Sequence, residues 1–188
     1  MSSILKVNTI QDGGGNAIIT SDGSGTFTSN LPNTGITMVD QWRLTANLSI
    51  SGNGTTGITA NLERVDTNTP GFIGTGMTES SGVFTFPSTG IYKITSHWSV
   101  LASADSTFLR INNEITTDNG TYETATEAGI SHAENGQYSS GSSAFTFDVT
   151  NTTTHKVRFR VRHNNSGNVL GSSTVSKTNF LFERLGDT

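Results

Sequence analysis

The sequence has 188 residues and a mass of 19.9 kDa, enough for one domain of ordinary size with a short extension. Hydrophobic residues (32%) and charged residues (14%) are few, but a net charge of only −4 and ten phenylalanines argue against disorder. Together with 21 glycines, this composition favours short strands and tight turns. The sequence excludes disulfides and thiolate metal sites (no cysteine), nonspecific nucleic-acid binding (pI near 5.5) and a membrane-spanning apolar run.

Residues 1–35 differ from the rest of the chain and are predicted to form an N-terminal β arm. Two short apolar runs, Ile4–Ile10 and Ala17–Ile19, are separated by Gly13–Gly15 and followed by Asp22–Gly25, which is a pattern of strands and turns. The segment lacks the apolar core of a signal peptide. Because two strands alone are marginally stable in water, we expect the arm to pair with a sister chain or with a host structure.

Residues 36–188 are predicted to be strands separated by turns, since no segment has the apolar period of a helix. The clearest strand is His155–His163, in which apolar and basic residues alternate. Gly90–Leu101 also alternates and is expected to be covered on both faces. Further strands are expected at Phe108–Asn113, Ala144–Val149 and Asn179–Leu185. Many short strands with no helices between them predict a β-sandwich or barrel.

The same alternation separates buried from outward side chains. Four aromatic side chains are assigned to buried faces: Tyr92, Phe147, Phe159 and Phe182. Four basic side chains share the outward face of the His155–His163 strand: Lys156, Arg158, Arg160 and Arg162. Two interpretations of this basic face stay open, namely an anionic partner and a solvated sheet surface with acidic neighbours on adjacent strands.

Glycine-containing dipeptides indicate where the chain turns. Asn53-Gly54, Asn119-Gly120 and Asn135-Gly136 suit type I′ hairpin turns. Gly52–Gly57 matches G-x-G-x-x-G, but β-branched residues follow it where a dinucleotide site needs a helix, so a hairpin turn is favoured. Asp-Gly pairs at Asp12 and Asp22, and the Asp118–Gly120 segment, favour turns over Ca²⁺ loops because the repeated acidic spacing of such a loop is missing.

Three segments in order resemble the C1q/TNF-like jelly-roll family. Phe84–Ile94, with its Pro87 and Gly-x-Tyr, resembles the family's central signature; Ala144–Val149 with His155–Val161 resembles its next-to-last hairpin, and Phe180–Phe182 its terminal strand. The family's usual Gly-Asp is replaced by three threonines before the next-to-last strand. The resemblance covers about residues 38–186. It implies an all-β jelly-roll β-sandwich and a homotrimer, with the four aromatics in the sandwich or at the threefold axis.

The N-terminal stretch Ile4–Asp12, together with Asp22–Gly25, is similar to the opening of structural proteins from marine tailed phages. This similarity implies a virion surface protein that binds rather than catalyses, with no cofactor, metal, nucleic-acid partner or membrane insertion. Residues 1–35 would attach it to other virion proteins. Two roles are open: a trimeric fibre or knob that contacts a host-surface glycan, and a capsid decoration protein that stabilises the head.

For the host-contact role, short polar residues between predicted strands are the candidate contacts at an exposed tip. They are Asp105, Ser106, Asp118, Asn119, Asn164, Asn165 and Asn168. Four aromatic residues are either buried or able to stack on sugars: Trp42, Trp98, Tyr122 and Tyr138. A polysaccharide-degrading enzyme, the least favoured alternative, would need a carboxylate pair. Such a pair would come from Glu114, Glu123, Glu127 and Glu134.

Overall fold

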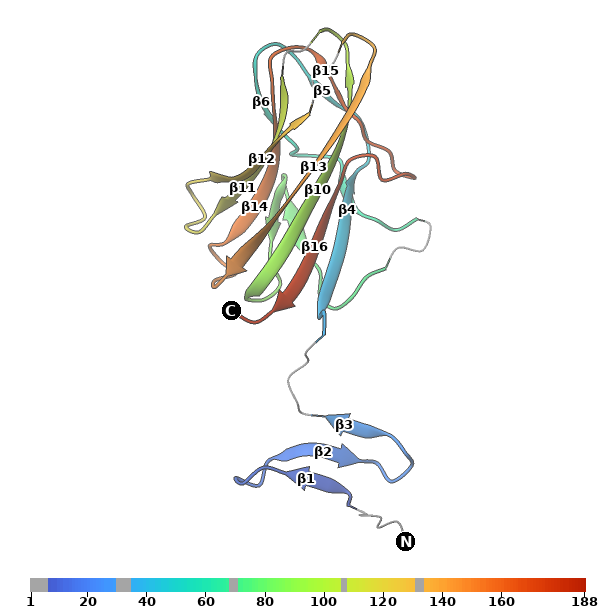
Figure 1. Cartoon of the computed structure of the whole chain (residues 1–188), viewed down its shortest axis with the longest axis vertical. Helices are drawn as coiled ribbons and strands as arrows, with labels where there is room; N and C mark the ends of the chain where they lie inside the picture. The colour runs from blue at the N-terminus through green and yellow to red at the C-terminus, as the bar shows by residue number, and fades with distance from the viewer. Residues whose placement is uncertain (1–6, 30–34, 68–70, 106–107, 131–133) are drawn as a thin grey trace. The chain divides into compact units, whose positions relative to one another are not determined.

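The computed structural model describes residues 7–29, 35–67, 71–105, 108–130 and 134–188, and the chain divides into two compact units, Met1–Thr34 and Gly35–Thr188 (Figure 1). The division falls beside the boundary expected at residue 35. The start of the arm, residues 1–6, and the candidate contact Ser106 lie outside the described residues.

The first unit is a three-stranded antiparallel sheet in the order β1-β2-β3. The strands are β1 (Thr9–Gln11), β2 (Ala17–Ser21) and β3 (Phe27–Ser29), so the sequence analysis missed one strand. The turns are built as the Asp-Gly pairs predict: Asp12 Oδ1 accepts a hydrogen bond from the amide of Gly14, and Asp22 Oδ1 accepts one from the amide of Ser24. Hydrogen bonds from the side chain and backbone of Asn16 hold the pKa of Asp12 below its usual range, and those from the side chain and backbone of Ser24 do the same for the pKa of Asp22.

This small sheet has no core of its own. None of its described residues is buried, and Ile10 and Phe27 are 47% and 66% exposed. An isolated sheet of this size cannot remove enough apolar surface from water to offset the entropy of ordering the chain. The arm is therefore expected to be stable only against another surface.

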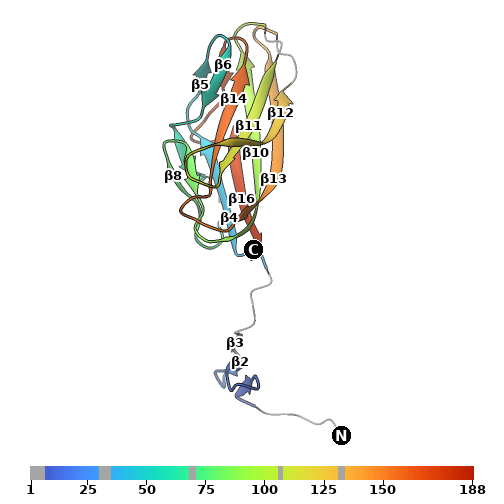
Figure 2. The ribbon, with the colours of Figure 1, turned by 90° about the vertical axis from the view of Figure 1, so that its left-hand side faces the viewer.

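The second unit consists of two antiparallel sheets. The seven-stranded sheet contains β4 (Met38–Leu44), β5 (Leu48–Ile50), β7 (Leu62–Arg64), β10 (Gly90–Ala102), β13 (Tyr138–Val149), β15 (Gly167–Val169) and β16 (Asn179–Gly186). The six-stranded sheet contains β6 (Gly54–Gly57), β8 (Thr78–Ser80), β9 (Val83–Thr85), β11 (Leu109–Thr116), β12 (Glu123–Ile130) and β14 (Lys156–His163). The seven-stranded sheet lies toward the viewer in Figure 1, and β11 and β14 come into view in Figure 2.

Each sheet is arranged around a central strand of its own, β10 in the seven-stranded sheet and β14 in the six-stranded sheet. β10 pairs along its whole length with β13 on one side, and on the other with β16 and then β15. β14 pairs in the same way with β11 on one side, and with β9 and then β6 on the other. We call the end of the unit where β4 and β10 begin the proximal end, and the end where β10 finishes and β6 begins the distal end.

The core lies between the sheets and is largely aromatic. Phe159 of β14 stacks on Phe180 of β16 with ring centroids 3.9 Å apart, and Phe84 of β9 packs on both Phe159 and Phe182. Each of the four aromatics that the alternation assigns to buried faces is at most 7% exposed within the single chain: Tyr92, Phe147, Phe159 and Phe182. No described residue lies in a helix, so the described chain contains no apolar helix of membrane-spanning length.

The turn types differ from the prediction. A type I′ turn needs positive φ at both central residues, and none of the three Asn-Gly pairs has it: only Asn119 (60°) and Gly136 (80°) are positive. The pair that meets the condition is Ser81-Gly82, at 52° and 82°, between β8 and β9. A Cβ at Gly82 would lie 2.0 Å from the carbonyl oxygen of Ile58, so both the turn and the packing require glycine there.

Three further expectations are wrong, two about strand pairing and one about burial. Asn53-Gly54 and the Gly52–Gly57 run connect β5 to β6, which lie in different sheets, so this turn closes no hairpin. The two strands taken for the next-to-last hairpin, β13 and β14, likewise lie in different sheets. Only one face of β10 is buried, because its outward side chains are half-buried or exposed. Turn dipeptides report local backbone preference, and they do not report which sheet the next strand joins.

Replacing Phe159 by alanine is expected to destabilise the second unit by about 3–5 kcal/mol, because it removes a ring packed against three others between the sheets. The melting temperature should fall by roughly 10 °C. Phe72→Ala is the control, since Phe72 is 49% exposed and its loss should cost less than about 1 kcal/mol. Calorimetry of both variants tests this, and equal melting temperatures for the two would contradict the core assignment.

Candidate binding surfaces

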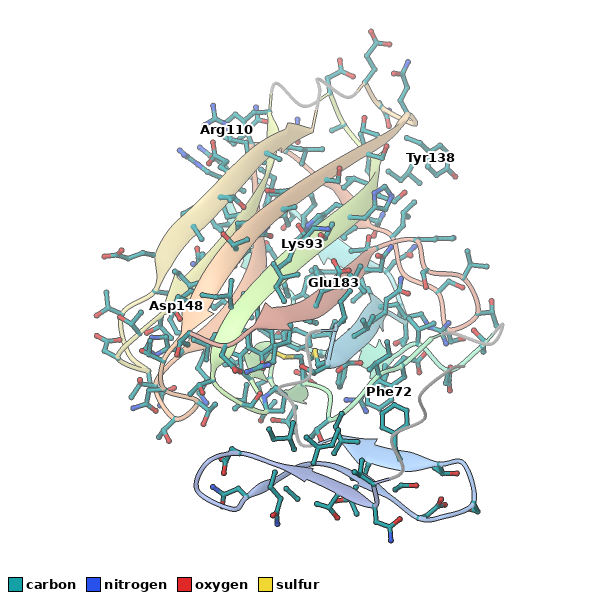
Figure 3. All side chains as sticks on the ribbon, turned by 60° about the horizontal axis from the view of Figure 1, so that its bottom comes forward. Phe72, Lys93, Arg110, Tyr138, Asp148 and Glu183 are labelled. Atoms are coloured by element: carbon teal, nitrogen blue, oxygen red, sulfur yellow. The ribbon has the colours of Figure 1, made fainter. Side chains whose placement is uncertain are left out.

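The outward face of the seven-stranded sheet carries small side chains and few charges. On β13 and β10 the outward residues include Thr95, Ser99, Ser140, Ser142, Ala144 and Thr146, which we call the small-residue face. Lys93 and Glu183 form an ion pair on the same face with a nitrogen–oxygen distance of 3.2 Å, as Figure 3 shows. Asp148 of β13 is a further exposed charge on this face. A face of small side chains with few charges is suited to burial against another protein surface.

The edge of the same sheet is open on one side. β13 forms a ladder only with β10, and it touches β12 of the other sheet through the hydrogen bond from Ser143 to Thr126. Asp148 is its only charged residue, and Tyr138 at its distal end is 72% exposed (Figure 3). A long edge strand with only one charge pairs readily with other chains unless an interface covers it.

Two of the three candidate contact segments meet at the distal end. Asn165 Nδ2 donates to the carbonyl of Asp105 at 2.8 Å, and Asn164 Oδ1 accepts from the amide of Phe108 at 3.2 Å. Asn168 Oδ1 accepts from Ser49 in the neighbouring strand. These side chains hold the loops together, so part of their hydrogen-bonding capacity is used within the chain.

The third segment, around Asp118 and Asn119, lies at the opposite end, so the seven residues do not form one tip. It follows Thr116, which pairs with Lys156 at the proximal end of β14. Asp118 Oδ1 accepts hydrogen bonds from the Thr116 hydroxyl and from the amides of Gly120 and Thr121. These bonds lower the pKa of Asp118 from 3.8 to about 2, the Thr116 hydroxyl contributing most.

The basic side chains of β14 face outward with acidic neighbours between them. Glu114 of β11 binds both Arg158, at 2.7 Å, and Arg160, at 3.4 Å. The guanidinium of Arg158 also stacks on Tyr122, 3.8 Å from the ring centroid. We call Arg158, Arg160 and Arg162 the arginine row.

Lys156, the fourth basic residue of β14, is buried, unlike the residues of the arginine row. Lys156 is only 9% exposed, and its Nζ donates to the carbonyl of Thr152 at 2.7 Å, so it adds no exposed cation to the face. Burial lowers the pKa of this ammonium group. Arg162 is exposed at the distal end, where it and Arg110 both lie over the ring of Phe108.

A groove lies beside the arginine row, in the gap between β6 and β9, which pair with successive parts of β14. It has a volume of about 250 Å³. It is lined by two arginines, Arg158 and Arg160, and by uncharged residues: Gly57, Ile58, Thr59, Ser81, Gly82, Val83 and Phe159. The alternation along β14 predicts the arginines but not this groove, because the segments that form it are far apart along the chain.

Three of the four candidate catalytic carboxylates are engaged by other side chains. Glu114 and Glu127 are each bound by arginine, the second through Arg110 at 2.8 Å. Glu134 accepts from Gln137 at the distal end, and Glu123 lies at the proximal end of β12. Carboxylates held in this way do not form the free pair that flanks the scissile bond in a glycosidase.

The aromatic side chains divide between the core and the surface. Trp98 is fully buried, and Trp42 packs on Phe84 while its Nε1 donates to Asp40. Tyr122 supports Arg158 at the surface. Tyr138 is thus the most exposed of the four residues considered for sugar stacking.

Comparison with known proteins supports the fold rather than a family. No protein-family model matches the sequence, and no curated protein sequence matches it. Among solved structures, an Eiger TNF from S. frugiperda covers 82% of this chain and 96% of its own, with a TM-score of 0.61 and 14% identity. Murine APRIL at pH 5.0 covers 79% and 98%, with a TM-score of 0.58 and 17% identity.

The second unit is a TNF-like jelly roll. The vertex protein P5 of PRD1 is also similar, covering 81% of this chain and 99% of its own with a TM-score of 0.50 and 14% identity. In this jelly roll, β4, β16, β10 and β13 present the small-residue face, and β14 with β11 presents the arginine row. The two candidate surfaces therefore lie on opposite sheets.

The Asp118 turn gives a pH-dependent prediction. Because the pKa of Asp118 is lower in the folded chain, its contribution to turn stability is present above pH 3.8 and is lost as the pH falls through about 2. An NMR titration of the Asp118 carboxyl should show a midpoint near 2. Thr116→Val removes the main hydrogen bond and should move that midpoint toward 3.8; a variant that titrates like the wild type would contradict this account.

Proposed function

We propose that this protein is a non-enzymatic, trimeric surface component of a phage virion that attaches the particle to its host. The observation that carries the proposal is the arm: a sheet with no buried residue among those described, joined to a jelly roll that has a complete core. Such an arm needs a partner surface to be stable. A protein built in this way is suited to being held by its N-terminal arm while the jelly roll contacts other molecules.

The small-residue face supports the trimer. TNF-like folds usually form homotrimers, and this face offers little charge to desolvate when it is buried. Three copies closing around an axis would also cover the open edge of β13. Residue types of this kind, rather than large apolar ones, allow the sheets of neighbouring chains to approach closely.

Two similarities support the proposal that the protein is part of a phage virion. The N-terminal stretch is similar to the opening of marine tailed-phage structural proteins, and one structural neighbour is a vertex protein. The vertex position of that neighbour also favours the second candidate, a decoration protein that stabilises the capsid. The fibre or knob is preferred because the arginine row gives the jelly roll a surface for a ligand.

Trimer formation should depend on the small-residue face. The full chain is expected to sediment near three times 19.9 kDa. Ala144→Arg places an unpaired charge on β13 and should give a folded monomer, whereas Ser80→Arg, on an exposed edge of the other sheet, should leave the trimer intact. A monomeric wild type at micromolar concentration, or a trimeric Ala144→Arg variant, would contradict the proposal.

Attachment to the particle should depend on the arm. A chain lacking residues 1–34 keeps the whole jelly-roll core and should fold, but it should not join virions. Binding of labelled full-length trimer to host cells then separates the two roles. Host binding supports the fibre or knob, while no binding to any susceptible host, together with capsids that burst on mild heating when the protein is missing, would support decoration.

A further inference from the structure

We propose that the outward face of β14 is a binding site for an acidic polysaccharide, in which Arg160 and Arg162 hold the anionic groups and the groove beside Arg158 and Arg160 holds a sugar ring. This inference deepens the proposed host-attachment role by naming the chemistry of the ligand. The shared chemistry is a sugar polymer with repeated carboxylate or sulfate groups.

The distribution of charge is the first argument. Four of the 11 lysines and arginines of an acidic chain are exposed or half-buried on the outward face of the six-stranded sheet: Arg110, Arg158, Arg160 and Arg162. Glu114 and Glu127 offset two of the four guanidinium charges there. Arg162 has no carboxylate partner within the described ranges, so the face keeps an excess of positive charge at its distal half.

The strand fixes the spacing of these charges. Alternate residues on a strand lie about 6.6 Å apart, so the three guanidiniums of the arginine row follow one line. Aromatic rings support both ends of the row, Tyr122 under Arg158 and Phe108 beside Arg162. Rings that limit side-chain motion lower the entropy lost when an anion is bound.

The three arginines differ in how firmly the chain holds them. Arg158 binds Glu114 through two nitrogens at 2.7 Å. Arg160 makes only long contacts, 3.4 Å to Glu114 and 3.4 Å to the carbonyl of Thr55. Arg158 therefore positions Glu114 and borders the groove, while Arg160 and Arg162 keep donors for an incoming carboxylate or sulfate.

The groove supplies the uncharged part of the site. At about 250 Å³ it is smaller than the roughly 300–1,000 Å³ of pockets for drug-sized ligands, a size that suits a single ring. Its uncharged lining combines Ile58, Val83 and Phe159 with Thr59, Ser81 and two glycines. It therefore offers apolar surface for the face of a sugar ring and a few polar groups for the ring's hydroxyls.

A polysaccharide fits this surface better than nucleic acid. Duplex DNA binding needs many cations to replace condensed counterions, and this chain has a net charge of −4. A few guanidiniums beside a small groove would give weak binding at one site, which three copies would strengthen through avidity.

The test measures binding of the intact full-length trimer to four immobilised polymers: polygalacturonate, dextran sulfate, neutral dextran and duplex DNA. We expect binding to one or both acidic polysaccharides, weakened by salt, and none to neutral dextran. Binding to polygalacturonate alone assigns carboxylate, and binding to dextran sulfate alone assigns sulfate. No binding to either acidic polymer at low salt, or tighter binding to DNA, would overturn the proposal.

Variants with matched charge changes locate the site. Arg160→Gln with Arg162→Gln should weaken binding about tenfold or more. Lys177→Gln, which removes one exposed charge elsewhere, should stay within about twofold of wild type and is compared with the single variant Arg162→Gln. Glu114→Gln removes the competing carboxylate and should strengthen binding, an effect that a purely structural role would not produce. Equal losses from Arg162→Gln and Lys177→Gln would overturn the site.

The same variants separate this inference from the proposed function. If host cells bind the double arginine variant as well as wild type, the arginine row is not the host-contact site although attachment itself stands. If the arginine-dependent polymer binding is found but no host cell binds the trimer, the site stands and the attachment role fails. Loss of both cell and polymer binding in the double variant supports the two together.

Discussion

The stacking of Phe159 on Phe180 between the two sheets is the contact on which the surfaces of the jelly roll depend. Because side chains on a strand alternate, burying Phe159 fixes which residues of β14 point outward, and these are the arginines. Burying Phe180 and Phe182 likewise turns Leu181 and Glu183 outward on β16 beside β10. A shift of either strand by one residue would put charges into the aromatic core, so both outward faces are set by the packing between the sheets.

The two outward faces differ in a way that separates assembly from binding. One is rich in serine, threonine and alanine and carries few charges, the Lys93–Glu183 ion pair and Asp148 among them, so burial against sister chains would desolvate little charge. The other concentrates guanidiniums, each partly satisfied by a carboxylate or an aromatic ring. Burying that second face in a protein interface would require desolvating several charges. Its composition suits a wet contact with a charged polymer, where the arginines keep part of their hydration.

Sequence patterns predict the features of this chain that are local. Alternation gives the buried aromatics and the outward arginines, and the Asp-Gly pairs give the turns of the arm, because both depend on neighbouring residues only. The assignment of β13 and β14 to different sheets depends on distant partners and could not be predicted in this way. The same holds for buried charges: Asp40 is fully buried, and its partner Arg64, three strands later along the chain, bonds it at 2.7 Å. The groove at Ser81-Gly82 could not be predicted either, because it is formed by three segments that are far apart along the chain.

The proposed polymer binding depends on the proposed assembly, because binding at a single site is weak. An exposed guanidinium loses much of its attraction for an anion to water and salt, so one arginine row would hold a polymer only briefly. Three rows fixed on one trimer would raise the local concentration of sites, because a polymer released from one row would meet the next before it diffuses away. That gain would require the small-residue faces to hold the three jelly rolls in a fixed arrangement. It also requires the arm to be covered by a partner structure, since a sheet without a core would otherwise leave apolar side chains such as Phe27 in water.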